Sequence, residues 1–344
     1  MENLVVNSSV PDSTFWKGKK VLITGVGGFI GSNLAASLLE KGSYVTGLVR
    51  DKTPISNLKI SGIDSKITIV WGELQDYNLM ERVITKYKIE YIFHLGAQAI
   101  VALAQQSPVS TFESNIRGTW CLLEAARCIG GLKGIIVASS DKAYGKHKDL
   151  PYTEDFCLAP TFPYDISKAC TDLIARGYSF SYELPVAVLR CANTYGEGDV
   201  NLSRIIPDTI YSLMNGQNPI IRSDGTPIRD YLYVDDAVLA YLSIARAITN
   251  SQIQGQAFNV GTNKPLSVNE VVEKLLKISG KTNLKPKILG KSIPHGEIDH
   301  QYLNSKKIDD LIGWEYKTPP EKGLQKTWDW WAKNWDLLKG LRTI

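Results

Sequence analysis

Hydrophobic and polar positions alternate in blocks along the first half of the chain. Short apolar runs predict strands, and segments between them, such as Ile30–Glu40, carry apolar residues at intervals near 3.6, which predicts helices. This alternation is typical of a parallel sheet with right-handed helical crossovers, so we expect an α/β fold. The predicted strands are Lys20–Thr24, Tyr44–Val49, Ile67–Trp71, Tyr91–His94, Gly134–Ser139, Val186–Arg190 and Ala257–Val260.

The pattern changes after Arg190. Glycine and proline recur between residues 196 and 227, which predicts loops and short elements over the carboxyl edge of the sheet. A helix is predicted over Ser267–Ser279, with Ser267 and Glu270 spaced as a capping box. We interpret the tryptophans near the end of the chain as core and dimer surface: Trp328, Trp330, Trp331 and Trp335.

The amino-acid composition limits the class of protein to which this chain can belong. The 344 residues are 44% hydrophobic and 22% charged, as in ordinary globular chains. The net charge of +4 comes from 39 basic and 35 acidic residues that are scattered, so we expect no nucleic-acid partner. No apolar run could span a bilayer and no signal peptide is visible, which favours a cytoplasmic protein. Five cysteines without a C-x-x-C pair indicate reduced thiols, and four dispersed histidines predict no metal site.

A glycine-rich turn follows the first predicted strand. Gly25, Gly28 and Gly31 are spaced G-x-x-G-x-x-G. Gly25 suits a tight turn, Gly28 lets the backbone approach a pyrophosphate, and Gly31 lets the helix pack close to the strand. The backbone N–H groups of Phe29 and Ile30, at the helix start, would face the anion. A ligand-free glycine turn is the alternative, but the βαβ context favours dinucleotide binding.

The end of the second strand bears on the choice between NAD and NADP. A carboxylate there binds a ribose 2′-hydroxyl, whereas an arginine favours a 2′-phosphate. Both Arg50 and Asp51 are present. Arg50 favours NADP slightly, a solvated Arg–Asp pair is the alternative, and the cofactor is predicted only as NAD(P)+.

Two further segments carry candidate chemistry. Tyr164 and Lys168 are four apart in a helical stretch and share one helix face, where an ammonium would stabilise a phenolate base. Residues 139–145 read SSDKAYG and follow an apolar strand at the edge where open α/β sheets bind ligands. The alternatives are a surface tyrosine with a solvated lysine, and a polar turn capped by Gly145.

Together these motifs resemble the extended short-chain dehydrogenase/reductases. The resemblance rests on the glycine turn, His94-Leu95-Gly96-Ala97-Gln98, Asn115-x-x-Gly118-Thr119, Ser140, Tyr164 and Lys168, and it runs from about Trp16 to Trp331. It implies a Rossmann-type, doubly wound parallel sheet with a smaller α/β C-terminal substrate domain, a nucleotide-sugar substrate and a homodimer through a four-helix bundle. The implied division is 1–14 as a flexible N-terminus, 15–190 plus about 232–262 as the NAD(P)-binding domain, and about 191–231 and 263–335 as the substrate domain.

Within that family, Ser140-Asp141-Lys142 resembles the 4,6-dehydratases, in the variant of the CDP-glucose enzymes where lysine replaces glutamate. The resemblance implies that Tyr164 deprotonates the C4 hydroxyl while C4 loses hydride, which later returns to C6. Lys168 would lower the tyrosine pKa and hold the nicotinamide ribose, and Ser140 would bind the C4 oxygen. Lys142 would be the base for the C5 proton, and a protonated Asp141 the acid for the departing C6 hydroxyl.

Other readings stay open. Residues 229–236 read RDYLYVDD, the general epimerase/dehydratase pattern, and the glycine turn lacks the CDP-glucose group's extra lysine near Phe29. GDP-mannose 4,6-dehydratase is therefore an alternative, and Arg50 would suit its NADP preference. A 4-epimerase or reductase needs neither Asp141 nor Lys142, and a non-catalytic dinucleotide-binding protein is the least favoured reading.

The resemblance also implies the remaining contacts of the site. Asn193 and Arg229 are expected at the sugar diphosphate, where a guanidinium suits phosphate oxygens, and Arg204 is expected near the nucleotide. The alternatives are a turn asparagine for Asn193 and a solvated arginine for Arg204. The further expected substrate residues are Gln98 and Asn115, and the further expected cofactor residues are Glu73, near the adenine, with Leu74, Leu95 and Ala97.

Overall fold

The computed structural model describes residues 12–53, 55–290 and 298–341. Its centre is a seven-stranded, wholly parallel sheet of order β11-β6-β5-β4-β1-β2-β3. Every predicted strand is present with ends within one residue, which confirms the predicted α/β fold class. The strands are β1 Lys20–Thr24, β2 Tyr44–Val49, β3 Thr68–Trp71, β4 Tyr91–His94, β5 Gly134–Ser140, β6 Val186–Cys191 and β11 Ala257–Val260.

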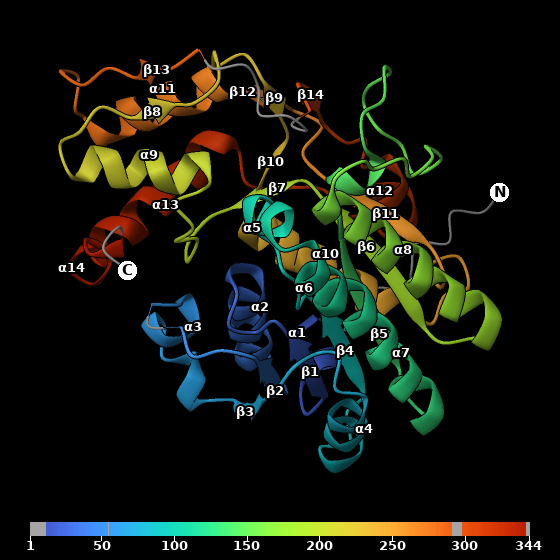
Figure 1. The fold of residues 1–344 in the computed structure, drawn as a ribbon. Helices are drawn as coiled ribbons and strands as arrows, with labels where there is room; N and C mark the ends of the chain where they lie inside the picture. The colour runs from blue at the N-terminus through green and yellow to red at the C-terminus, as the bar shows by residue number, and fades with distance from the viewer. Residues whose placement is uncertain (1–11, 54, 291–297, 342–344) are drawn as a thin grey trace.

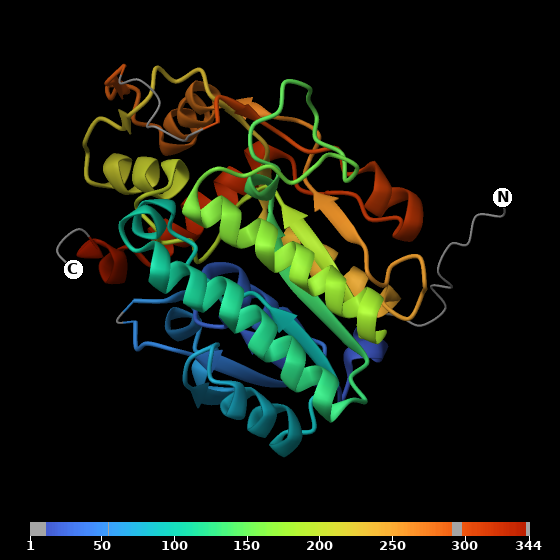
Figure 2. The ribbon, with the colours of Figure 1, turned by 45° about the vertical axis from the view of Figure 1, so that its right-hand side comes forward.

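Helices cover both faces of this sheet (Figure 1). Alternate residues of β1 supply the two cores: Val21 and Ile23 join the cluster beneath α2 and α10, and Leu22 joins the one beneath α4, α7 and α8. Figure 2 shows α7 and α8 running side by side across one face. The covering helices are α2 Phe29–Glu40, α4 Tyr77–Lys86, α7 Gly118–Ile129, α8 Pro163–Tyr182 and α10 Val234–Ala247.

A smaller lobe of helices and two-residue strands lies beyond the carboxyl edge of the sheet (Figure 1). The predicted capping box is present, with Ser267 and Glu270 capping α11. Trp331 is fully buried against Tyr211, as expected of a core tryptophan. The lobe contains α9 Ile205–Met214, β8 Ile220–Ile221, β9 Ile228–Arg229, α11 Val268–Ser279, β12 Leu266–Ser267, β13 Lys287–Ile288, β14 His300–Gln301, α13 Pro320–Lys333 and α14 Trp335–Leu338.

Short elements complete the chain. Helix α12, Lys306–Ile312, falls in the sequence range expected for the substrate domain. It nevertheless packs against strand β11 of the large sheet and against the covering helix α10. Helix α1, Asp12–Trp16, begins inside the stretch expected to be flexible, and Trp16 is buried on Tyr91; residues 1–11 lie outside the described part. The others are α3 Asn57–Ile60, η1 Ile63–Ser65, α5 Val101–Gln106, α6 Pro108–Phe112, η2 Glu113–Arg117, η3 Asp141–Tyr144, β7 Asn193–Tyr195 and β10 Tyr231–Tyr233.

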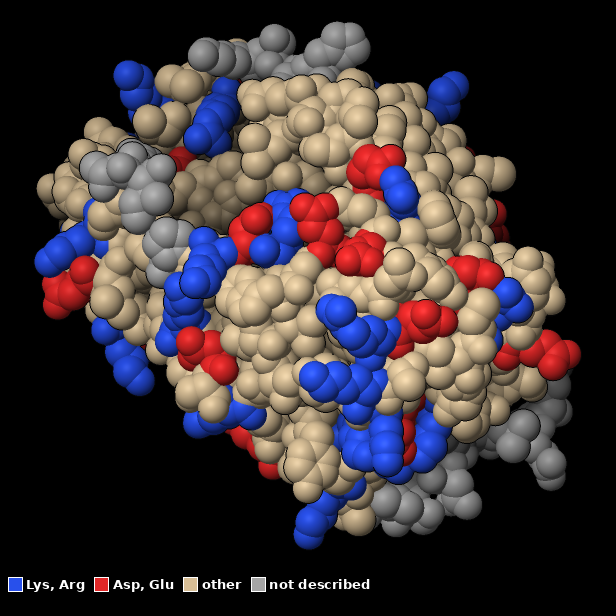
Figure 3. Space-filling view, turned by 60° about the horizontal axis from the view of Figure 1, so that its bottom comes forward, with Lys and Arg blue, Asp and Glu red and all other residues tan. Residues whose placement is uncertain are grey.

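The surface matches the scattered charge of the sequence. On the face drawn in Figure 3, acidic side chains interrupt the basic ones, so the positive charge forms no continuous patch there. None of the helices in the described ranges is long and apolar enough to cross a membrane.

Candidate active site

The glycine turn lies between β1 and α2, at the point where the strand order reverses between β1 and β4. Gly25 has φ +72°, and a Cβ there would lie 2.7 Å from the Cα of Gly96 after β4. A Cβ on Gly31 would lie 2.3 Å from the carbonyl oxygen of Gly25. Both positions therefore require glycine, one for the turn and one for the close helix, as predicted.

The same turn fits a dinucleotide. Gly28 is exposed at the N-cap of α2, with no side-chain cap on the helix. The N–H groups of Phe29 and Ile30 have no acceptor within the helix because they belong to its first turn. An open cradle at a helix N-terminus is a suitable site for a pyrophosphate.

The expected cofactor residues lie around this cradle. Leu74 is buried, and its side chain is the nearest neighbour that a Cβ on Gly96 would meet, at 2.9 Å. Leu95 and Ala97 flank Gly96 at the carboxyl end of β4, and Glu73 is exposed beside Leu74. Arg50 Nε donates to Asp51 Oδ2 at 2.6 Å, and both side chains are more than half exposed. This arrangement is the solvated Arg–Asp pair.

The candidate catalytic groups come from β5, η3 and α8, which pack together. Ser139 Oγ donates to the carbonyl oxygen of Lys168 at 3.2 Å, and Lys168 Nζ donates to the carbonyl oxygen of Ala138 at 2.8 Å. Tyr164 is hydrogen-bonded to Ser140, whose Oγ donates to Asp141 Oδ1 at 3.0 Å. Two segments separated by some twenty residues of chain thus form one constellation.

Burial dominates the acid–base properties of this constellation. It raises the pKa of Tyr164, an effect to which the charge of Asp141 adds, while the hydrogen bond to Ser140 and the charge of Arg204 oppose it. Burial lowers the pKa of Lys168 to about 8. Arg204 is the cation that acts on Tyr164 here, so the expected effect of Lys168 on the tyrosine stays a prediction.

Several buried polar atoms of the site have no hydrogen-bond partner among the described residues. They are Asp141 Oδ2, Asn193 Nδ2 and Gln301 Oε1. Leaving such an atom unpaired costs about 1–3 kcal/mol, a cost that a polar ligand would remove. Gln301, on β14, also donates from Nε2 to the carbonyl oxygen of Asp141 at 2.8 Å. No motif marks Gln301 in the sequence. It lies on a two-residue strand and is 160 residues away from Asp141 along the chain, so only the fold brings the two together.

Comparison with known proteins places this geometry in a family. The family model described as GDP-mannose 4,6 dehydratase matches residues 22–327. The chain belongs to the GDP-mannose 4,6-dehydratase family. The predicted relationship to nucleotide-sugar 4,6-dehydratases of the extended short-chain dehydrogenase/reductases is confirmed at this level.

The individual proteins to which the chain is similar are named for sugars attached to different nucleotides. A CDP-glucose 4,6-dehydratase of Salmonella typhimurium is 29% identical over 95% of both chains. The solved dTDP-glucose 4,6-dehydratase of Bacillus anthracis, in complex with NAD, has a TM-score of 0.82 at 29% identity and covers 94% of this chain and 100% of that one. The UDP-glucose 4-epimerase of Thermotoga maritima, with UDP-glucose, has a TM-score of 0.83 at 30% identity over 92% and 99%.

Three of the residues expected to contact the substrate make hydrogen bonds to other residues of the protein. Asn115 is buried, accepts from the backbone N–H of Gln98 at 2.6 Å and donates to Ser167 Oγ at 2.9 Å, so it anchors the loop of Gln98 to α8. Arg204 donates to Asp199 Oδ2 and to the carbonyl oxygen of Thr194, both at 2.5 Å. Arg229 is buried, and its Nη1 donates to the carbonyl oxygens of Ile228 and Asp299, each at 2.9 Å.

A buried histidine, His94, links the end of β1 to α7 through hydrogen bonds. The N–H of Gly96 donates to Thr24 Oγ1 at 3.0 Å, so Thr24 in turn donates to His94 Nδ1 at 2.8 Å. Thr119 Oγ1 donates to the carbonyl oxygen of Asn115 and accepts from His94 Nε2 at 3.0 Å. Each donor in this series of hydrogen bonds has one proton and gives it to the next acceptor. His94 must therefore be neutral, with its proton on Nε2.

We expect this histidine to make stability depend on pH. Burial lowers the pKa of His94 to about 3, and the charge of Lys168 adds to the effect. Only the unfolded chain then binds a proton at His94 just below its ordinary pKa of about 6.5, so stability falls as pH falls. Between pH 7 and pH 5 the loss from this group is roughly 2 kcal/mol.

Urea unfolding of the wild type and of His94→Asn at the two pH values measures this loss. Asparagine keeps one donor and one acceptor but does not titrate, so the variant should lose less stability between pH 7 and pH 5. The comparison is made between the two proteins because Asp165 and Asp230, whose pKa values burial raises to about 6, stabilise the fold as pH falls. Identical pH dependence in the two proteins would contradict a neutral His94.

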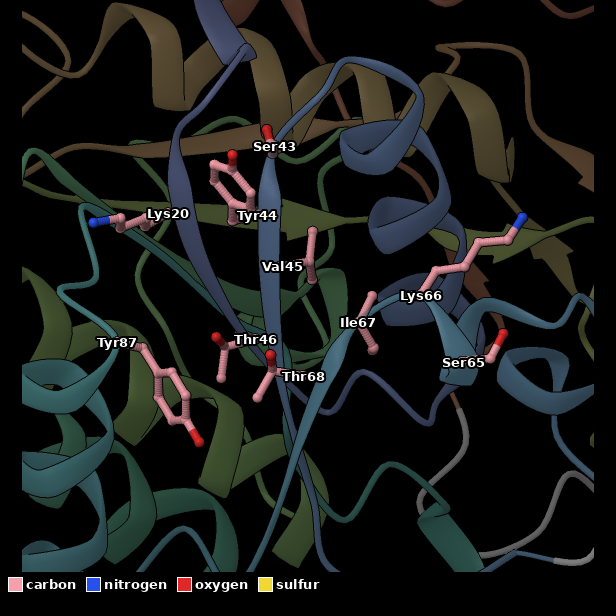
Figure 4. Close-up of a pocket in the computed structure, with 10 residues that line it drawn as sticks. All are labelled: Lys20, Ser43, Tyr44, Val45, Thr46, Ser65, Lys66, Ile67, Thr68 and Tyr87. Carbon is pink, nitrogen blue, oxygen red and sulfur yellow. The ribbon is translucent and has the colours of Figure 1, made fainter.

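A separate hollow lies away from this chemistry. It encloses about 370 Å³ and is lined by the amino-terminal residues of β1, β2 and β3, including Lys20, Tyr44 and Thr68. In Figure 4 the amino groups of Lys20 and Lys66 point outward on opposite sides of it. Ligands of open α/β sheets bind at the carboxyl edge, so we assign no role in the dehydratase site to this hollow.

Proposed function

We propose that this chain is a nucleotide-sugar 4,6-dehydratase that converts an NDP-hexose, with CDP-glucose favoured, to the NDP-4-keto-6-deoxyhexose. The observation that carries the proposal is the turn Ser140-Asp141-Lys142 beside Tyr164, with Ser140 and Asp141 buried, because only a dehydratase uses both an acid and a base there. The lysine of this turn and the CDP-glucose 4,6-dehydratase among the relatives support the choice of nucleotide. GDP-mannose 4,6-dehydratase is the second choice.

In this proposal, the backbone N–H groups of Phe29 and Ile30 at the glycine cradle would hold the pyrophosphate of NAD(P)+, which when bound would supply the hydride acceptor for C4 and the hydride donor for C6. Tyr164 takes the proton of the C4 hydroxyl, and Ser140, hydrogen-bonded to Tyr164, also binds that oxygen. The resulting C4 carbonyl acidifies the C5 proton, which Lys142 takes. Asp141 gives a proton to the C6 hydroxyl, which leaves as water, and its otherwise unpaired Oδ2 is free for that contact.

Proton NMR of the purified protein with CDP-glucose, GDP-mannose, UDP-glucose and dTDP-glucose, each in turn, tests the proposal. A new C6 methyl doublet with one of them establishes dehydration and identifies the nucleotide. A C4 epimer without a methyl signal would instead assign the chain to the 4-epimerases and remove the roles of Asp141 and Lys142.

We also propose that the protein acts in the cytoplasm as a homodimer through a four-helix bundle. Leu173 and Phe180 are 57% and 64% exposed and seven residues apart, so they share one face of α8. Trp120, 39% exposed, adds apolar surface on the neighbouring α7. A second copy that presents the same two helices would cover this face by twofold symmetry.

Replacing both Leu173 and Phe180 by glutamate is expected to convert the dimer to a monomer, because the twofold axis would bring like charges together. Light scattering coupled to size-exclusion chromatography measures the mass. Leu337→Glu, at a residue of α14 that is 59% exposed, is the matched control and should stay dimeric. A wild type that elutes as a monomer, or a dimeric double variant, would exclude this interface.

A further inference from the structure

A glutamine of the smaller lobe contacts the turn that carries the candidate acid. Gln301 lies on β14 and is fully buried, and its Nε2 donates to the backbone carbonyl oxygen of Asp141 at 2.8 Å. Because a carbonyl oxygen accepts only from a donor, the amide nitrogen must face Asp141. Within the described ranges this is the side chain's one hydrogen bond, since its Oε1 is buried without a partner. Holding Asp141 is therefore the contact that accounts for a buried amide here.

The backbone on both sides of Gln301 is fixed in place. The carbonyl oxygen of Asp299 accepts from Arg229 Nη1 at 2.9 Å, and β14 pairs with β9, the strand of Arg229. The carbonyl oxygen of Tyr302 accepts from the backbone N–H of Tyr152 at 3.0 Å. The amide thus reaches the turn from a rigid support rather than from a free loop.

The carboxyl group of Asp141 is held at a second point. Ser140 Oγ donates to its Oδ1 at 3.0 Å, while its Oδ2 is buried without a partner among the described residues. Since Oδ1 already accepts a hydrogen bond, the proton of the acid belongs on Oδ2. One anchor on the carboxyl group and one on the backbone together set the direction in which Oδ2 points.

The proposed elimination depends on that direction. A hydroxyl group leaves carbon readily only as water, so the acid must deliver its proton within hydrogen-bond distance of the C6 oxygen. A misplacement of about 1 Å in such a group can lower the rate about 10²-fold. A residue that fixes the acid can therefore limit the reaction without contacting the substrate.

We infer that Gln301 is a positioning residue for the acid step, which holds the backbone of Asp141 so that Oδ2 reaches the departing C6 hydroxyl. In that step the O–H bond of Asp141 breaks, an O–H bond forms on the C6 oxygen, and the C6–O electrons leave with water. The electrons of the C5–H bond form the C5–C6 double bond, and the C5 proton goes to Lys142. Gln301 acts through Asp141, and the inference rests on the proposed function.

The test compares Gln301→Met with the wild type on CDP-glucose and on its 6-deoxy-6-fluoro analogue. Methionine has a similar length but no donor, so the carbonyl group of Asp141 loses its anchor. Fluoride leaves C6 without a proton, so only the hydroxyl substrate needs the acid. Formation of the C6 methyl group should fall about 10–100-fold with CDP-glucose but stay within about threefold of the wild type with the analogue. If the wild type dehydrates another of the four nucleotide sugars, that sugar and its 6-fluoro analogue are used.

Two controls accompany this comparison. C4 oxidation, followed as single-turnover formation of reduced nicotinamide, should change little in Gln301→Met, because Tyr164 and Ser140 keep their contacts. Gln217→Met, at an exposed residue between α9 and β8 of the same lobe, should behave as the wild type on both substrates. Gln301→Leu, which also lacks a donor, repeats the test if the methionine variant does not fold.

The leaving group separates positioning of the acid from a merely structural role. Equal losses on the hydroxyl and fluoro substrates would overturn the inference, as would dehydration of CDP-glucose at the wild-type rate in Gln301→Met. If the wild type itself forms no C6 methyl group from any of the four sugars, the proposed function fails, which is a different result from failure of the positioning role.

Discussion

Replacing Tyr164 by phenylalanine is expected to lower the rate of C4 oxidation by about 10²–10⁴-fold, the usual contribution of a positioned acid–base group. The substitution removes only the phenol oxygen, which is hydrogen-bonded to Ser140, and keeps the ring on α8. Without this oxygen, the proposed base for the C4 hydroxyl proton is missing. Single-turnover absorbance of the reduced nicotinamide measures the step directly.

Tyr182→Phe is the matched control for this variant. Tyr182 is the last residue of the same helix and is 53% exposed, so its loss should leave oxidation unchanged. The Tyr164 variant should bind the nucleotide sugar with nearly the wild-type affinity, because the phenol acts on the reacting oxygen. Oxidation that proceeds at the wild-type rate in Tyr164→Phe would assign the base to another residue.

Replacing Lys142 by glutamine is expected to stop elimination but allow C4 oxidation. Glutamine has a similar length and polarity but no basic nitrogen, so the C5 proton would stay in place. The rate of C6 methyl formation and of deuterium entry at C5 should each fall by at least about 10²-fold. Reduced nicotinamide should accumulate, because C6 keeps its hydroxyl group when elimination fails and then cannot accept the hydride.

The exposed Lys148, in the loop that follows η3, supplies the control Lys148→Gln, which should behave as the wild type. Proton NMR of the product and absorbance of the cofactor, recorded on the same sample, distinguish the two halves of the reaction. Full dehydratase turnover in Lys142→Gln would exclude the lysine as the base.

Much of the fold is predictable because its signals are local. The strands repeat apolar residues in short runs, and Val21, Leu22 and Ile23 fill both cores simply because successive side chains point to opposite faces. Gly25 and Gly31 are predictable for the same reason, since a turn and a close helix each require the absence of a Cβ within a few residues.

The site is predictable only in part. Tyr164 and Ser140 carry recognisable motifs, and the parallel sheet brings them together at its carboxyl edge, where they are hydrogen-bonded. Asn115 also belongs to a motif, and its expected contact with substrate stays a prediction, but the motif does not show that its side chain anchors the backbone of Gln98. An asparagine in a motif does not reveal which donors will surround it, because those donors come from other parts of the chain.

Asp165 and Gln301 illustrate what only the tertiary structure decided. As a sequence, Asp165 is one more acidic residue in the first turn of a helix, and Gln301 is a polar residue in a segment without a motif. Burial of Asp165 against η3 and the approach of Gln301 to Asp141 follow from packing between elements distant in the chain. The sequence by itself thus determined the sheet, the cradle and the reacting motifs, because these depend on short-range periodicity and backbone sterics. Which polar groups are buried, and what they face, depends on long-range contacts that no local pattern encodes.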